Sequence, residues 1–107
     1  MPDLPLAIAA YFKAKADADV IMLGEIFAPD AHVHDEENEY TGINAIRAWR
    51  VETFAQTPFS TCPIDVSDRD GTFVVRVEVS GAFPNNPVML NHSFALVDGL
   101  ISWLDIR

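Results

Sequence analysis

The spacing of hydrophobic positions changes partway along the chain. In the first half, the larger apolar residues recur every three or four positions, as amphipathic helices require. After Pro63 apolar and polar residues alternate, which is typical of strands that are buried on one face. Helices gathered early and strands gathered late predict an α+β layer architecture.

Three helices are predicted before the strands. Residues 4–18 form the first, with Asp3 as its N-cap and Pro5 in its first turn. Residues 20–27 form a short second helix, which Pro29 ends because the residue before a proline avoids the helical region. The third helix begins after Gly42 and ends before Pro58. Between the second and third helices, residues 31–35 alternate as a short strand, and the polar residues 35–39 predict a loop.

Turn residues divide the C-terminal half into four strands. Asp70-Gly71 and Asp98-Gly99 are strong hairpin signals, and the Pro-Asn-Asn-Pro segment at 84–87 predicts a further turn. The strands between them form an antiparallel meander. Because a strongly twisted sheet curls over a helix, we expect a concavity between the two layers, where ligand sites commonly lie.

Composition and charge narrow the class of protein. A chain of 107 residues with 50% hydrophobic content predicts one domain spanning residues 1–107. The net charge of −9 argues against nucleic acid and anionic membrane surfaces as partners. No apolar run approaches the roughly 20 residues of a membrane span. With no secretory signal pattern and the single cysteine Cys62, we expect a cytoplasmic protein.

Two motifs carry a family resemblance. The first is residues 27–35 (FAPDAHVHD), followed by Tyr-Thr-Gly at 40–42 and Ala-Ile-Arg at 45–47; the second is residues 94–101 (FALVDGLI). They resemble the signature after the second helix, and the hairpin before the last strand, of nuclear transport factor 2-like proteins. The SnoaL-like and ketosteroid isomerase-like branch is the most similar, over essentially the whole chain.

This resemblance implies a fold and an assembly. The fold is a cone-shaped α+β barrel, in which a curved antiparallel or mixed sheet wraps over three N-terminal helices and encloses an apolar pocket. Members commonly form a homodimer through the outer face of the sheet. A small apolar molecule is the expected partner in the pocket, and no cofactor or metal is expected.

The resemblance also implies roles for single residues. Asp35 stands where the isomerase has its general base, and Tyr11 where it has the tyrosine that holds the oxyanion. His92 stands where a protonated aspartate is the second oxyanion donor, although a shift of one residue selects Asn91 instead. Arg50 replaces a tyrosine that supports the oxyanion group. Five residues are expected to contact the ligand: Phe27, Trp49, Leu90, Phe94 and Leu104.

Two functions follow from these roles. In the first, Asp35 removes a proton next to a carbonyl of an apolar metabolite while Tyr11 and His92 hold the enolate oxygen, as in an isomerase or a polyketide cyclase. In the second, the same pocket belongs to a non-catalytic ligand-binding or dimerisation module.

Structural interpretations of the same residues stay open. Asp35 also begins the acidic run 35–37, which by itself favours a solvated loop. Tyr11 and His92 lie on apolar faces, where such side chains are often part of the core. If the register of the last strand shifts by one residue, Asp105 enters the pocket as a rival base and Trp103 leaves the outer face.

The remaining polar candidates predict no further site. His32 and His34 project from one face of their strand, as metal ligands can, but alternation places Asp35 on the opposite face, so we expect no metal site. Arg47 and Arg50 on the third helix are expected to pair with nearby acids.

Overall fold

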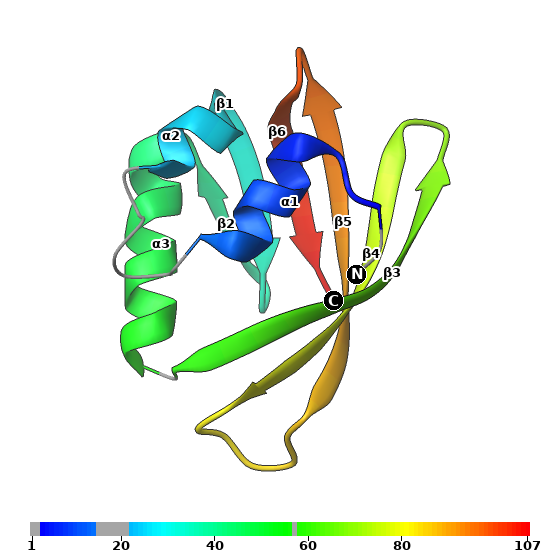
Figure 1. Ribbon diagram of the computed structural model, residues 1–107. Helices are drawn as coiled ribbons and strands as arrows, with labels where there is room; N and C mark the ends of the chain where they lie inside the picture. Colours follow the sequence, from blue (N-terminus) through cyan, green and yellow to red (C-terminus); the bar gives the residue numbers. More distant parts are fainter. Residues whose placement is uncertain (1–2, 15–21, 57) are drawn as a thin grey trace.

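The structure is a computed structural model that describes residues 3–14, 22–56 and 58–107, and in these residues three helices accompany a six-stranded sheet (Figure 1). The helices are α1 (Leu6–Lys13), α2 (Leu23–Ile26) and α3 (Ile43–Gln56). The strands are β1 (Phe27–Asp35), β2 (Asn38–Thr41), β3 (Phe59–Arg69), β4 (Thr72–Gly81), β5 (Val88–Val97) and β6 (Leu100–Ile106). The α+β architecture expected from the sequence is confirmed.

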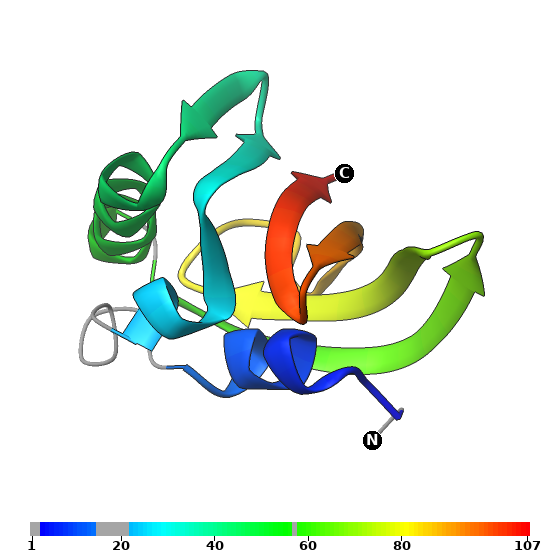
Figure 2. The ribbon, with the colours of Figure 1, turned by 90° about the horizontal axis from the view of Figure 1, so that it is seen from above.

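The sheet is mixed and curved. Its strand order is β2-β1-β6-β5-β4-β3, and all neighbours are antiparallel except β1 and β6, which are parallel. β2 and β3 are the two edges, so the sheet is an open cone and does not close into a complete barrel. The view from above shows how strongly β3 and β4 bend, with the helices on one side of the sheet (Figure 2).

The hydrophobic core lies between this side of the sheet and the helices. On β4, Val75, Val77 and Val79 are buried at alternate positions, as predicted. Ile8 of α1 and Ile46 of α3 are fully buried against the same cluster. None of the described helices is long and apolar enough to cross a membrane.

Both predicted hairpins are confirmed, and a third was missed. Residues Asp70, Gly71, Asp98 and Gly99 all have positive φ, between 53° and 90°, as two-residue hairpin turns require. The turn at 36–37 has the same backbone form, with φ of 51° and 70°, but consists of two glutamates. The loop expected over residues 35–39 is therefore wrong: Asp35 ends β1, and Asn38–Thr41 form β2. Glutamate carries none of the local preference for this turn, so pairing with β1 imposes it.

The helix boundaries differ from the prediction. α1 begins at Leu6 with Pro5 as its N-cap, so Asp3 is not the cap, and Ala14 is already extended. The predicted continuation to residue 18, and the start of the second helix, fall on residues 15–21, outside the described residues.

Prolines lie inside two strands. Pro29 belongs to β1, where the pairing with β6 is interrupted between Phe27 and His32, so its missing N–H breaks no regular ladder. β3 begins at Phe59, earlier than expected, and its register shifts just after Pro63. In both strands the proline lies where the hydrogen-bond ladder is irregular, so its missing N–H donor costs little.

A bulge in β6 decides which side chains face inward. The pairing with β5 shifts between Ala95 and Leu96, and the Ser102 hydroxyl donates a hydrogen bond of 3.1 Å to the Ala95 carbonyl. Because of this shift, Ile101 and Leu104 are both fully buried although they are three positions apart, an odd spacing that would put them on opposite faces of a regular strand. Beyond the bulge, successive side chains of β6 again point alternately to the inner and outer side of the sheet.

Candidate functional site

A pocket of about 590 Å³ opens between α1, α3 and the inner side of the sheet, a volume that suits a small molecule. Its wall combines a polar side, from α1, the β1–β2 hairpin and α3, with an apolar side from the later strands. The lining residues are Tyr11, Asp35, Glu36, Asn38, Tyr40, Trp49, Arg50, Glu52, Thr53, Gln56, Phe59, Thr61, Val79, Phe83, Val88, Leu90, His92 and Ile106.

Asp35 is held in place by Trp49. Asp35 is the last residue of β1. Its carboxylate, like the side chain of Val33 two positions earlier, lies on the inner face of the strand. The indole Nε1 of Trp49 donates a hydrogen bond of 3.0 Å to Asp35 Oδ2. The Trp49 ring in turn packs beside Tyr40, with the ring centroids 6.0 Å apart. Trp49 thus orients one carboxylate oxygen and leaves the other for a ligand.

Arg50 stacks on Tyr11 at the buried end of the pocket. Its guanidinium carbon lies 4.6 Å from the Tyr11 ring centroid, and Nη2 donates a hydrogen bond of 3.3 Å to the Ala14 carbonyl. Burial raises the pKa of the Tyr11 hydroxyl and the charge of Asp35 adds to this, while the charge and hydrogen bonding of Arg50 partly offset it. Tyr11 therefore remains a protonated donor at neutral pH.

His92 is a neutral histidine. It is 4% exposed, and its ring lies among Tyr11, Phe12 and Phe94, at centroid distances of 5.5 to 6.3 Å. Its Nδ1 has no hydrogen-bond partner among the described residues. Burial, and secondarily the charge of Arg50, lower the pKa of His92 to about 3. At neutral pH the imidazole can thus donate one hydrogen bond and accept another.

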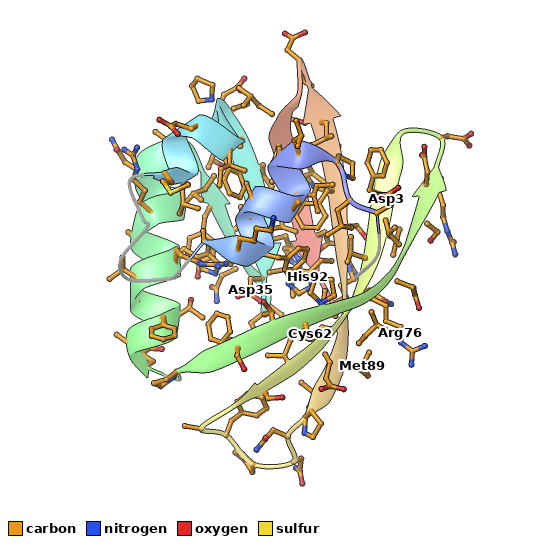
Figure 3. All side chains as sticks on the ribbon, in the orientation of Figure 1. Asp3, Asp35, Cys62, Arg76, Met89 and His92 are labelled. Carbon is orange, nitrogen blue, oxygen red and sulfur yellow. The ribbon has the colours of Figure 1, made fainter. Side chains whose placement is uncertain are left out.

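The structure brings the three expected catalytic residues to one pocket. Asp35, Tyr11 and His92 all line it, and Figure 3 shows Asp35 and His92 on the inner side of the sheet. Of the expected ligand contacts, Trp49 and Leu90 also line the pocket.

Three expected ligand contacts lie elsewhere. Phe27, Phe94 and Leu104 are absent from the pocket wall and are at most 1% exposed. The short helices α1 and α2 cover this part of the sheet, so these side chains fill the core behind the wall. They lie behind the pocket wall and support it, and their contact with a ligand stays a prediction.

Asp105 does not enter the pocket. It extends to the outer side of the sheet, where its Oδ1 lies 2.9 Å from His34 Nδ1 and its Oδ2 accepts a hydrogen bond of 2.6 Å from Arg107 Nε. Burial opposes ionisation, but the hydrogen bonds and charges of Arg107 and His34 outweigh it and lower the pKa of Asp105. The rival base is thus an anchored structural carboxylate, and Asp35 is the strand-end carboxylate on the pocket wall.

The histidines do not gather around a common centre. His32 Nδ1 lies 3.0 Å from the Thr41 hydroxyl and its Nε2 3.4 Å from Glu39, while His34 pairs with Asp105. His92 faces the opposite, inner side. Within the described ranges, no three His, Cys, Asp or Glu side chains are grouped so as to hold a metal ion.

Several pocket residues were not predicted as such from the sequence, and Arg50 and Tyr40 are the two most prominent. Arg50 was expected to pair with an acid, but no carboxylate oxygen lies within 4.0 Å of it in the part of the chain that the structure describes. The lining positions Trp49, Arg50, Thr53 and Gln56 share one helix face, and that spacing is the signal that could have found Arg50. Tyr40 was missed because β2 was not predicted.

Comparison with known proteins places this geometry in a family. The sequence matches the SnoaL-like domain over residues 8–102. The chain belongs to the SnoaL-like family, within the nuclear transport factor 2-like superfamily. Among curated proteins, none matches the sequence significantly.

Solved structures of other proteins share the fold. A Sinorhizobium meliloti protein described provisionally as a polyketide cyclase is 38% identical, with a TM-score of 0.92, over 98% of this chain and 96% of its own. A SnoaL-like protein from Jannaschia, similarly described, is 18% identical, with a TM-score of 0.78, over 94% and 81%. A Catenulispora acidiphila protein with a ketosteroid isomerase-like fold, solved with trimethylamine, is 16% identical, with a TM-score of 0.83, over 98% and 86%.

Proposed function

We propose that this SnoaL-like protein is an enzyme that removes a proton next to a carbonyl of a small apolar metabolite, in the manner of an isomerase or a polyketide cyclase. One observation carries the proposal. A strand-end carboxylate, Asp35, oriented by Trp49, shares one pocket with two buried neutral donors, Tyr11 and His92. A base and donors for an oxyanion are the parts that enolisation needs.

In the proposed step, Asp35 is the base, and Tyr11 and His92 are the donors that hold the oxygen. Asp35 takes the proton from the carbon next to the carbonyl; the C–H electron pair forms a C=C bond, and the carbonyl π electrons move to oxygen. Tyr11 and the N–H of His92 donate hydrogen bonds to this enolate oxygen, where preorganised donors contribute most. In an isomerase the enolate is conjugated with a second C=C bond: protonated Asp35 returns the proton to the far carbon of this dienolate, the carbonyl re-forms, and the C=C bond has moved. In a cyclase the enolate carbon bonds to a second carbonyl carbon of the same molecule, the first carbonyl re-forms, and the π electrons of the second carbonyl move to its oxygen, which takes the proton from Asp35.

Deuterium exchange tests the step without knowledge of the natural substrate. A panel of enones and polyketide-like ketones in D₂O, followed by NMR, reports loss of the proton next to each carbonyl. We expect wild-type protein to accelerate exchange in at least one ketone, and Asp35→Asn to reduce the rate about 10²- to 10⁴-fold, the usual contribution of a general base. Asp65→Asn is the matched control, because Asp65 is an exposed carboxylate that does not line the pocket. Exchange by no ketone, or equal exchange by Asp35→Asn, would disprove the proposal.

Ligand binding without turnover is the second candidate. The relative with the ketosteroid isomerase-like fold was solved with a small molecule, trimethylamine. In this chain the aromatic packing of His92 on Tyr11, Phe12 and Phe94 is what a structural histidine also shows. Saturable binding of an apolar molecule with no exchange in any ketone would favour this candidate.

Assembly as a homodimer through the outer face of the sheet accompanies both candidates. On this face, Trp103 is half-buried and Met89 is 41% exposed, and Figure 3 shows Met89 and Arg76 on that side. Sedimentation equilibrium measures the mass directly, and a monomer at micromolar concentration would contradict the dimer. The exposed free Cys62 suits a reducing compartment, and we propose the cytoplasm.

A further inference from the structure

We propose that the buried end of the pocket binds a permanent carboxylate of the ligand through Arg50, so that the ligand is an apolar carboxylic acid. This inference deepens the proposed function and rests on it for the use of this pocket. It adds a substrate class, because a neutral ketone has no group that needs an arginine.

The first argument is the burial of an unpaired charge. Arg50 is 6% exposed, and the acceptors found for it among the described residues, the Ala14 carbonyl and the Tyr11 hydroxyl, are both neutral. No carboxylate of the described ranges lies within ion-pairing distance, and Nε is buried without a hydrogen-bond partner. Burying a guanidinium is costly unless an anion compensates it. A ligand anion is the compensation that the pocket can supply.

The second argument is the geometry around the guanidinium. The Tyr11 ring covers it at 4.6 Å from the ring centroid, and the Phe59 ring lies 6.0 Å away. Aromatic stacking keeps the planar group fixed and leaves its N–H donors in the plane, which is how arginine receives a carboxylate. The neutral donors Tyr11 and His92 line the same pocket. Among the described residues no carboxylate lies within 4.0 Å of the guanidinium, so a ligand carboxylate would meet no competing ion pair at Arg50.

The third argument is the distribution of charge along the pocket. The acids of the wall, Asp35, Glu36 and Glu52, are half-buried or exposed, and their charges together raise the pKa of Tyr40 in addition to the effect of its burial. An anion is repelled at this acidic side and attracted at Arg50. The ligand is therefore directed with its carboxylate inward and its apolar body along Val88, Leu90 and Ile106.

Three probes with the same phenylethyl body test the charge. Hydrocinnamate carries a carboxylate, benzylacetone a ketone and phenylpropylamine a cation, and calorimetry gives the Kd of each. For wild-type protein we expect hydrocinnamate to bind at least about tenfold more tightly than benzylacetone, and phenylpropylamine to bind most weakly. Equal binding of the three probes, or tightest binding of the amine, would overturn the inference without any variant.

Two variants assign the preference to Arg50. Arg50→Met removes the charge at similar length, and we expect it to abolish the preference for hydrocinnamate over benzylacetone. Arg50→Lys keeps the charge without the planar fork and should restore part of the preference. Arg76→Met is the matched control, because Arg76 is an exposed arginine that points away from the pocket (Figure 3). An undiminished preference in a folded Arg50→Met would overturn the assignment.

The outcomes separate this inference from the proposed function. If ketones exchange deuterium in an Asp35-dependent way while hydrocinnamate shows no Arg50-dependent advantage, the inference fails and the enzyme proposal stands. If hydrocinnamate binds through Arg50 while no ketone exchanges, the inference stands for a binding protein and the enzyme proposal fails.

Discussion

Replacing His92 with methionine should remove a defined part of the acid sensitivity of this protein. His92 is 4% exposed and its pKa is lowered to about 3, from about 6.5 in an unfolded chain. Between these two values the unfolded state binds a proton that the folded state does not. By linkage, the free energy of unfolding therefore falls as the pH falls below 6.5, and the loss levels off near the folded pKa.

The magnitude follows from the difference in pKa. Each pH unit below 6.5 costs about 1.4 kcal/mol as long as His92 stays neutral in the fold. At pH 5 the loss from this one group is about 2 kcal/mol relative to pH 8. That value depends only on the folded pKa of His92 lying well below 5. Methionine is close to histidine in size, packs against aromatic rings, and does not titrate.

Urea unfolding at pH 8 and at pH 5 measures the effect. We expect His92→Met to lose about 2 kcal/mol less than wild type between the two pH values. Leu90→Met is the control, since Leu90 is a neighbour on β5 without a titratable group, and its pH dependence should match wild type. If wild type and His92→Met lose the same stability, His92 is not buried as a neutral residue.

Three further changes test other parts of the fold by urea or thermal unfolding. Leu104→Ala should cost about 2 to 5 kcal/mol, because a fully buried side chain behind the pocket wall leaves a cavity; a cost near zero would show that this position is not core. Glu37→Gly should stabilise by about 0.4 to 1 kcal/mol, because Glu37 has φ of 70°; destabilisation would contradict the turn. Asp105→Asn should be destabilised by about 1 to 3 kcal/mol at neutral pH, since it loses charged hydrogen bonds to His34 and Arg107. Because the folded pKa of Asp105 is lowered, that difference should shrink as the pH falls below about 3.9, and a constant difference would refute the ionised pair.

The later strands and the third helix could be predicted because their signals are local. Asp70-Gly71 and Asp98-Gly99 suit their turns by intrinsic backbone preference, and the valines of β4 alternate without interruption. β2 could not be predicted in this way. Its turn, at 36–37, is formed by glutamates against their preference, and only pairing with β1 explains it.

The pocket residues also fall into those that the sequence could predict and those that depend on the pairing of strands. The family resemblance led to Asp35, Tyr11, His92 and Trp49, and all four line one pocket. Which carboxylate faces inward depends on the bulge in β6, a property of two paired strands that no local pattern contains.

The sequence by itself determined the order of the three helices and of every strand except β2, and which faces are apolar, because periodicity and turn preference act between near neighbours in the chain. Only the tertiary structure decided what surrounds each polar group. It gave Arg50 an aromatic ring in place of the expected acid, and it gave Asp105 two hydrogen-bonded partners outside the pocket. Burial and charge compensation are set by residues far apart in the chain, and those contacts exist only once the sheet has curved around its helices.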